Sequence, residues 1–200
     1  MGETEYQIRS RKTQFETRED GETPHIAGYF AVFDSIYECG PGETESIAPG
    51  AFSRSLSGDI RALTNHDSTL VLGRTAAGTL TIREDQRGLW GDIAINPNDS
   101  DAMNTWQRVR RGDVSQCSFG FVPVRVDTEI KPDGTVHYTV MDVDLAEISV
   151  CTFAAYEETS ISARSAQKGV YKESRLKAWR ERMKGALKNG PQSPATEEDD

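Results

Sequence analysis

Between residues 25 and 153 the chain divides into short apolar segments of strand length, and glycine, proline or aspartate separates most of them. Such segments at short intervals are typical of antiparallel sheets. One stretch alone has helical spacing: residues 98–100 offer a capping side chain, Trp106 and Val109 lie on one side, and Gly112 follows the last basic turn. This pattern excludes a doubly wound nucleotide-binding fold and predicts a mostly β, α+β chain.

Apolar content and turn residues also set the expected order of elements along the chain. Residues 38–46 are expected to form a loop, and residues 49–56 a short helix with Pro49 in its first turn. Residues 131–134 predict a turn in a hairpin with a long second arm. The expected strands cover residues 25–33, 60–66, 71–75, 79–84, 88–95, 115–126, 135–140 and 145–153.

The length of 200 residues predicts one domain with extensions at both ends. We expect a polar leader, frayed or partly stranded, over residues 1–24 and the folded domain over residues 25–163. A basic amphipathic helix is expected over residues 164–188, followed by a disordered acidic tail over residues 189–200.

Charge and hydropathy exclude two classes of partner. The net charge of the whole chain is -9. Residues 164–188 contain nine basic residues and two glutamates, and the last four residues are acidic, so residues 164–200 carry a net charge of +3. Residues 1–163 therefore carry a net charge of -12. Such an acidic body argues against general nucleic-acid binding. No apolar run approaches the roughly 20 residues that span a bilayer, and the charged start lacks the apolar core of a secretory signal. The protein is expected in the cytoplasm, away from membranes.

Motifs for cofactors and metals are missing from the sequence. It contains no glycine-rich phosphate-binding string and no HExxH, and neither His25 nor His137 has a second ligand at helical or hairpin spacing. Cys39, Cys117 and Cys151 have no CxxC spacing and are expected as reduced thiols. We therefore expect no cofactor and no metal, and acyl-transfer chemistry remains as the candidate activity.

Ser118 is a candidate nucleophile within the stretch GDVSQCSFGF. Strand alternation would place Phe119 and Phe121 on a core face, with Ser118 and Gly120 on the other face. A glycine beside the hydroxyl leaves room for a substrate backbone. The alternative is an ordinary serine on a solvated strand, and Ser115 is a weaker rival.

His66 is the best candidate for a general base, because a serine hydroxyl needs a neighbouring base to attack a carbonyl. It stands where a predicted strand breaks into a loop, between Asn65 and Asp67. The alternative is a histidine in a surface turn.

An acid could orient that base, and three occur in the stretch MDVDLAEISV. Glu147 would point to the opposite face from Asp142 and Asp144, since it lies an odd number of residues from both. A carboxylate between Ala146 and Ile148 is unfavourable unless it is paired, which favours Glu147. The alternative is a carboxylate at the rim or in a salt bridge with an arginine.

The ordered strings GYFAVF, IAPGAFSRSL, IRALTNHD, VLGRT, RGDVSQCSFGF and DLAEISVCTFAAY together resemble the prohead protease family of tailed phages. These are the maturation proteases of HK97-like capsids, and they are related to the herpesvirus assemblins. The resemblance runs from about Gly28 to Tyr156. It implies a serine endopeptidase on an assemblin-type β-barrel of mostly antiparallel, mixed strands with flanking helices.

By this resemblance the nucleophile is Ser118, the general base is His66 and the third member is Glu147. Assemblins use a second histidine as the third member, so His137 is kept as a substitute and Asp144 as a rival. The implied substrates are the phage coat protein or its scaffolding segment, and the protease itself by autoprocessing. The implied location is the inside of the immature capsid in the host cytoplasm, and a homodimer is left open.

Two rival functions come from other readings of the same residues. A cysteine protease would use Cys117 or Cys151 as the nucleophile, although alternation turns Cys117 toward the aromatic face. A non-catalytic module that binds capsid or scaffold would carry its histidine and serine as relics.

Overall fold

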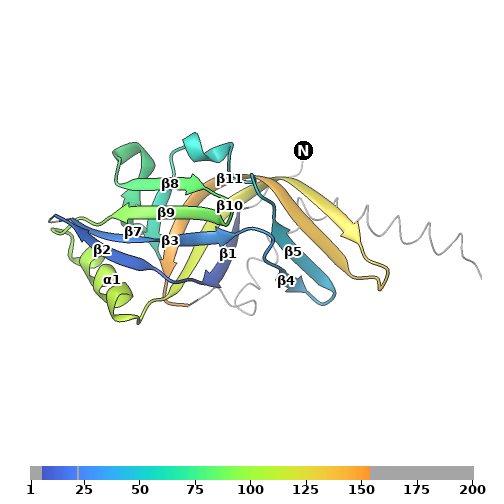
Figure 1. Ribbon diagram of the computed structural model, residues 1–200, viewed down its shortest axis with the longest axis horizontal. Coiled ribbons are helices and arrows are strands. Elements are labelled where there is room, and N and C mark those ends of the chain that lie inside the picture. The colour runs from blue at the N-terminus through green and yellow to red at the C-terminus, as the bar shows by residue number, and fades with distance from the viewer. Residues whose placement is uncertain (1–5, 22, 154–200) are drawn as a thin grey trace, which may run out of the picture.

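Two β-sheets and one α-helix make up the part of the chain that the computed structural model describes, residues 6–21 and 23–153 (Figure 1). The seven-stranded sheet has the order β1-β10-β11-β5-β4, with β6 paired to β11 and β7 paired to β6. The four-stranded sheet has the order β2-β3-β9-β8. The strands are β1 (Gln7–Lys12), β2 (Glu16–Asp20), β3 (Thr23–Val32), β4 (Tyr37–Gly40), β5 (Glu43–Ile47), β6 (Arg61–Thr64), β7 (Asp67–Arg74), β8 (Leu80–Glu84), β9 (Gly88–Ala94), β10 (Gln116–Ile130) and β11 (Val136–Cys151).

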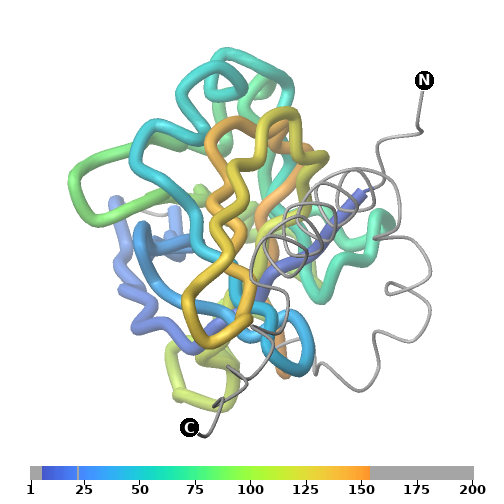
Figure 2. The backbone as a smooth tube through the Cα atoms, turned by 90° about the vertical axis from the view of Figure 1, so that its right-hand side faces the viewer, coloured from blue at the N-terminus to red at the C-terminus, as the bar shows by residue number. Residues whose placement is uncertain are grey.

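The β10–β11 hairpin is the longest feature of the molecule, with strands of 15 and 16 residues. Its base belongs to the larger sheet, and its tip projects as an arm alongside β4 and β5 (Figure 1). Figure 2 looks along this arm toward the body. At the tip the Gly134 amide donates to the Lys131 carbonyl, and Gly134 has a φ of 84°. The predicted turn and the long second arm are confirmed.

Aromatic side chains from β10 enter the core between the sheets. Phe119 and Phe121 are fully buried, and their ring centroids lie 5.2 Å apart. Phe52 meets the Phe119 ring edge-on at 5.4 Å. The inward face expected from alternation is therefore confirmed, and Ser118 lies on the other face of the same strand.

The predicted helix is α1 (Ser100–Arg111). The Asp99 carboxylate caps it by accepting hydrogen bonds from the amides of Asp101 and Ala102, and Gly112 ends it with a φ of 87°. Trp106 is buried, and its indole nitrogen donates to the main chain of β3 at 3.1 Å. Among the described residues, no helix is long and apolar enough to cross a membrane.

The expected closed barrel requires correction. Within residues 6–21 and 23–153 the strands pair into two separate sheets, and the sheets meet through packed side chains rather than through strand pairing. The predicted helix of residues 164–188 and the tail of residues 189–200 lie outside the described residues.

Three segments also differ from the sequence-based expectation. Residues 38–46, expected as a loop, lie largely in β4 and β5, because β5 pairs in parallel with the arm of β11. Residues 49–56, expected as a short helix, form turns that end in a 3-10 helix, Ser55–Ser57. Residues 7–20, expected in a frayed or partly stranded leader outside the folded domain, supply β1 and β2, one to each sheet.

Candidate active site

His66 lies in a two-residue turn that joins β6 to β7. Asn65 and His66 have φ values of 52° and 61°, as a type I′ hairpin turn requires at both central positions. Asparagine suits the first position, whereas a histidine at the second is strained and depends on surrounding contacts. The Asn65 main-chain amide donates to the Val150 carbonyl, and Asn65 Oδ1 accepts from the Thr152 main-chain amide at 2.9 Å. The end of β11 therefore fixes the turn that carries the imidazole.

Glu147 is a buried carboxylate with three hydrogen-bonding partners. His66 Nδ1 lies 2.7 Å from its Oε1, and the Tyr6 hydroxyl donates to the same oxygen at 2.9 Å. The Ser149 hydroxyl donates to Oε2 at 2.6 Å. Burial, followed by the charge of Glu147, raises the pKa of the Tyr6 hydroxyl, so this group stays a donor at neutral pH. These contacts satisfy the carboxylate and orient the imidazole.

Ser149 lies two residues after Glu147 on β11 and contacts both members of the pair. It is fully buried, and its hydroxyl accepts from the His66 main-chain amide at 3.2 Å. Sequence reasoning missed this residue. The signal was available, because Glu147 and Ser149 lie two apart on one strand and must share a face.

Ser118 is on the strand beside this pair and on the same face. It is paired directly with Ser149, and Gly120 is paired with Glu147. Side chains that are directly opposite in antiparallel strands have Cβ atoms about 5 Å apart. The Ser118 hydroxyl is turned away from β11, however: it donates to the Arg9 carbonyl at 2.8 Å. No hydrogen bond between Ser118 and His66 occurs among the described residues.

Gly120 leaves space that the structure fills with side chains of the site. A Cβ atom at this position would lie 1.7 Å from the Tyr6 hydroxyl and 2.4 Å from Glu147 Oε1. Both distances are far shorter than van der Waals contact. The glycine is therefore needed for Tyr6 to reach across β10 to Glu147.

The two buried cysteines differ in their distance from the imidazole. Cys117 points into the core, where its thiol contacts the Tyr29 carbonyl at 3.3 Å. Cys151 Sγ lies 3.8 Å from His66 Nε2. Burial raises the pKa of each thiol to about 12, so neither is a thiolate at neutral pH. This argues against the cysteine-protease alternative, most directly for Cys117.

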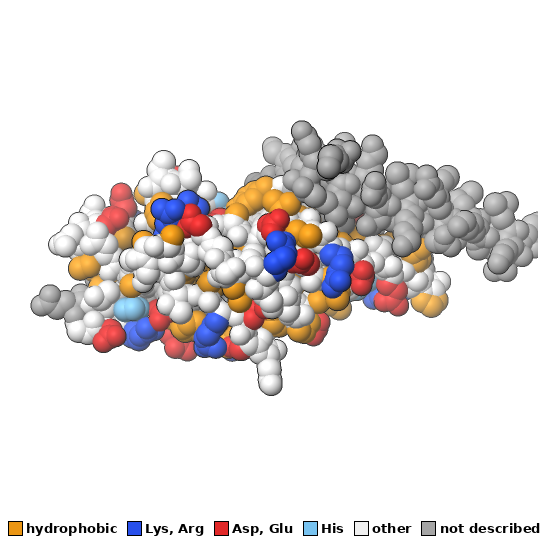
Figure 3. Space-filling model, turned by 90° about the horizontal axis from the view of Figure 1, so that it is seen from above, with side chains coloured by type: hydrophobic (Ala, Val, Ile, Leu, Met, Phe, Trp, Pro, Cys, Tyr) orange, Lys and Arg blue, Asp and Glu red, His pale blue; other side chains and the backbone are white. Residues whose placement is uncertain are grey.

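The other candidates for a third member lie elsewhere. Asp144 forms an exposed ion pair with Arg54 at 2.6 Å. His137 lies on the arm, where its ring nitrogens contact the hydroxyls of Thr44 at 2.8 Å and Ser46 at 2.9 Å. Seen from above, acidic and basic side chains lie close to one another on the described surface (Figure 3).

His25 belongs to the four-stranded sheet, where its Nδ1 lies 2.9 Å from an oxygen of Asp92. In residues 6–21 and 23–153 there is no group of three or more histidine, cysteine or acidic side chains that could hold a metal ion.

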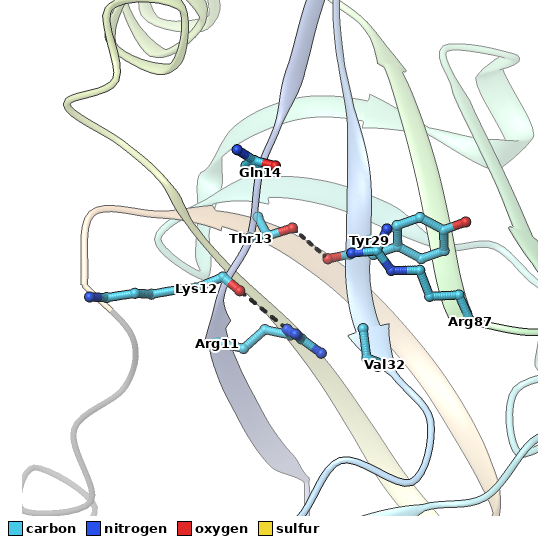
Figure 4. A pocket seen from close by; sticks show the side chains of 7 residues that line it. All are labelled: Arg11, Lys12, Thr13, Gln14, Tyr29, Val32 and Arg87. Atoms are coloured by element: carbon cyan, nitrogen blue, oxygen red, sulfur yellow. Dashed lines mark hydrogen bonds between the residues drawn. The ribbon is translucent and has the colours of Figure 1, made fainter.

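A separate cavity of about 290 Å³ opens between the end of β1 and β3. Figure 4 shows the Thr13 hydroxyl donating to the Tyr29 carbonyl at its wall, at 3.0 Å. The cavity contains no member of the cluster around His66. Its lining residues are Arg11, Lys12, Thr13, Gln14, Tyr29, Val32 and Arg87.

A histidine–carboxylate pair beside a serine is typical of serine-type hydrolases. The family model for the Caudovirus prohead serine protease matches residues 10–173, and the chain belongs to this family. The resemblance inferred from the sequence motifs is confirmed.

One protein of similar sequence and one solved structure are similar to this chain. The prohead protease of Enterobacteria phage HK97 is 29% identical over 163 residues, which cover 80% of this chain and 68% of that protein. The capsid assembly protease of bacteriophage T4 superposes with a TM-score of 0.50 at 8% identity, covering 74% of this chain and 96% of that one. The second likeness shows a shared fold alone.

Proposed function

We propose that this protein is a serine endopeptidase of capsid maturation, with Ser118 as nucleophile, His66 as general base and Glu147 as the orienting acid. The observation that carries the proposal is the 2.7 Å contact between His66 Nδ1 and the buried carboxylate of Glu147, one strand away from Ser118. Because Nδ1 is engaged by the carboxylate, Nε2 is the nitrogen that would exchange a proton with an alcohol, in place of its 3.8 Å contact with Cys151 Sγ.

In this proposal, the Ser118 side chain must rotate before catalysis can occur. Turning the Ser118 side chain about its Cα–Cβ bond moves the hydroxyl from Arg9 toward β11 and the imidazole, since serine has three staggered rotamers. The oxygen then attacks a peptide carbonyl carbon while His66 Nε2 takes the proton. Glu147 stabilises the positive charge that forms on the ring. The imidazolium next protonates the leaving amine, and water hydrolyses the resulting ester.

The proposed substrates follow from the family. Relatives are named prohead protease and capsid assembly protease, so we infer that this enzyme cleaves the coat protein or its scaffolding segment inside the procapsid. We also infer that it processes itself.

The test is incubation of the purified protein with its coat or scaffold protein, followed by mass spectrometry of every new terminus. Ser118→Ala and His66→Ala should each abolish new termini while circular dichroism shows a retained fold. Ser115→Ala is the matched control, because this exposed serine lies immediately before the first residue of the same strand. Unchanged cleavage by Ser118→Ala would remove the nucleophile from the proposal.

Two reagents separate the rival functions. A serine-directed phosphonate should inactivate the protein, and iodoacetamide should not. Inactivation by iodoacetamide alone would favour a cysteine nucleophile. Normal head assembly with Ser118→Ala, without loss of scaffold processing, would favour the non-catalytic binding module.

A further inference from the structure

Strand β1 lies on the candidate nucleophile as a bound peptide would. It pairs antiparallel with the edge of β10, with Ser10 opposite Ser118. The Ser118 hydroxyl donates to the Arg9 carbonyl, and the Ser10 hydroxyl donates to Ser118 Oγ, each at 2.8 Å. Addition of an extended segment to a sheet edge is a common mode of peptide recognition. The peptide bond between Arg9 and Ser10 therefore occupies the position next to the nucleophile.

The Arg9 side chain reaches a buried carboxylate from the other face of β1. Its Nε lies 2.5 Å from Glu45 Oε1, and its Nη2 lies 2.8 Å from Glu45 Oε2. The Glu45 side chain is fully buried, and the Arg9 side chain is 10% exposed. The guanidinium also lies 5.6 Å from the centre of the Phe121 ring. Glu45 is thus paired with a cation that β1 delivers.

From this arrangement we propose that Glu45 is a specificity-determining residue and that the substrate is an extended segment with arginine or lysine just before the scissile bond. The proposal rests on the function proposed above. The incoming segment displaces β1, pairs with β10 in the same register and places its basic side chain on Glu45. A neutral residue there leaves a buried carboxylate without its cation, which is strongly unfavourable.

The reaction on such a segment is ordinary hydrolysis. Ser118 Oγ forms a bond to the carbonyl carbon of the basic residue, and the bond from that carbon to the next nitrogen breaks. The serine proton passes through His66 to the leaving amine. Water then adds to the ester and restores the hydroxyl.

β1 itself acts as a competitor in this scheme. The Ser118 hydroxyl points its proton at the Arg9 carbonyl oxygen, instead of directing a lone pair at the carbonyl carbon. Tyr6 also occupies Oε1 of Glu147. Because β1 is covalently attached, its effective concentration is on the order of millimolar, and weak substrates cannot displace it.

The experiment uses the full chain and peptides that copy residues 6–13, with arginine, lysine, glutamine or glutamate at the position of Arg9. Mass spectrometry identifies cleavage at the bond before the serine. We expect kcat/KM for arginine or lysine to exceed that for glutamine by about 100-fold. Glu45→Gln should bring this ratio close to one, and the exposed-site control Glu38→Gln should leave it unchanged. Equal cleavage of the arginine and glutamine peptides, or a preference that survives Glu45→Gln, overturns the proposal.

Arg9→Gln provides a second arm that does not alter Glu45. It weakens the internal competitor, so kcat/KM for the arginine peptide should rise about tenfold. A rate that stays the same or falls, in a variant with a normal circular dichroism spectrum, overturns the role of β1 as a competitor.

A binding measurement distinguishes failure of this inference from failure of the proposed function. Fluorescent versions of the peptides are titrated into the double variant Ser118→Ala, Arg9→Gln and followed by anisotropy. Tighter binding of the arginine peptide, without cleavage of any peptide by the Arg9→Gln variant in which the β1 competitor is weakened, supports the Glu45 subsite and removes the protease assignment. Cleavage without any preference in rate or binding leaves the protease standing and removes the subsite.

Discussion

Replacing Glu147 by glutamine tests the proposed role of the buried carboxylate in turnover. The substitution preserves size, and the amide oxygen can still accept from Tyr6 and from His66 Nδ1. Its NH₂ group then faces Ser149, whose hydroxyl can rotate to accept. We therefore expect the variant to fold, with an unfolding free energy lower by about 1–3 kcal/mol because the charge-assisted hydrogen bonds become neutral.

The loss of activity follows from the missing charge. With Nδ1 and Oε1 2.7 Å apart, the centres of the imidazolium and the carboxylate lie roughly 4 Å apart, and their attraction is about 4 kcal/mol at an effective dielectric constant of about 20. Since about 1.4 kcal/mol corresponds to a tenfold change, kcat should fall about 1000-fold.

The assay is single-turnover cleavage of a peptide substrate, with urea unfolding measured on the same preparations. Asp144→Asn is the matched control, because Asp144 is an exposed acid on the same strand that contacts Arg54. It should change the rate by less than about threefold, as expected for a surface pair. A Glu147→Gln variant within tenfold of the unaltered rate, or a larger loss in Asp144→Asn, would refute the reasoning.

Two further predictions concern the core and the thiols. Phe119→Ala should lower the unfolding free energy by about 3–5 kcal/mol, because its fully buried ring contacts two other aromatic rings. Val124→Ala, at an exposed position of β10, should change the unfolding free energy by less than about 0.5 kcal/mol. Urea denaturation measures both variants, and equal losses would contradict the assigned core. Burial raises the pKa values of the Cys117 and Cys151 thiols from 9.0 to about 12. Iodoacetamide at pH 8 should therefore alkylate these two thiols about 1000-fold more slowly than an ordinary thiol. It should also alkylate them more slowly than the partly exposed Cys39. Peptide mapping checks this, and faster labelling of Cys151 than of Cys39 would show that the thiol beside His66 is activated.

The helix and most of the strands in residues 60–153 could be predicted because their patterns are local. Alternation on β10 separated Ser118 from its aromatic neighbours, and the caps of α1 gave its ends within about two residues. The buried acid in an apolar strand pointed to Glu147 for the same reason. Each of these conclusions needed only neighbouring residues.

The contacts around β1 could not be predicted in this way. Its sequence, QIRSRK, has no apolar alternation, and it is a strand because the edge of β10 pairs with it. The ion pair of Arg9 with Glu45 joins residues 36 positions apart, and the bond from Tyr6 to Glu147 joins residues 141 apart. β4 and β5 were missed because glycine and proline suggested a loop, whereas pairing with β11 determined the outcome.

The two-residue connection that carries His66 limits where this protein can accept insertions in its sequence. A longer link between β6 and β7 would change the twist of the hairpin and move the ring off the carboxylate, even with every site residue retained. Insertions should therefore be far better tolerated at the tip of the arm than at residues 65 and 66. Chain length at that one bend, as much as residue identity, governs whether the imidazole stays within hydrogen-bonding distance of the carboxylate.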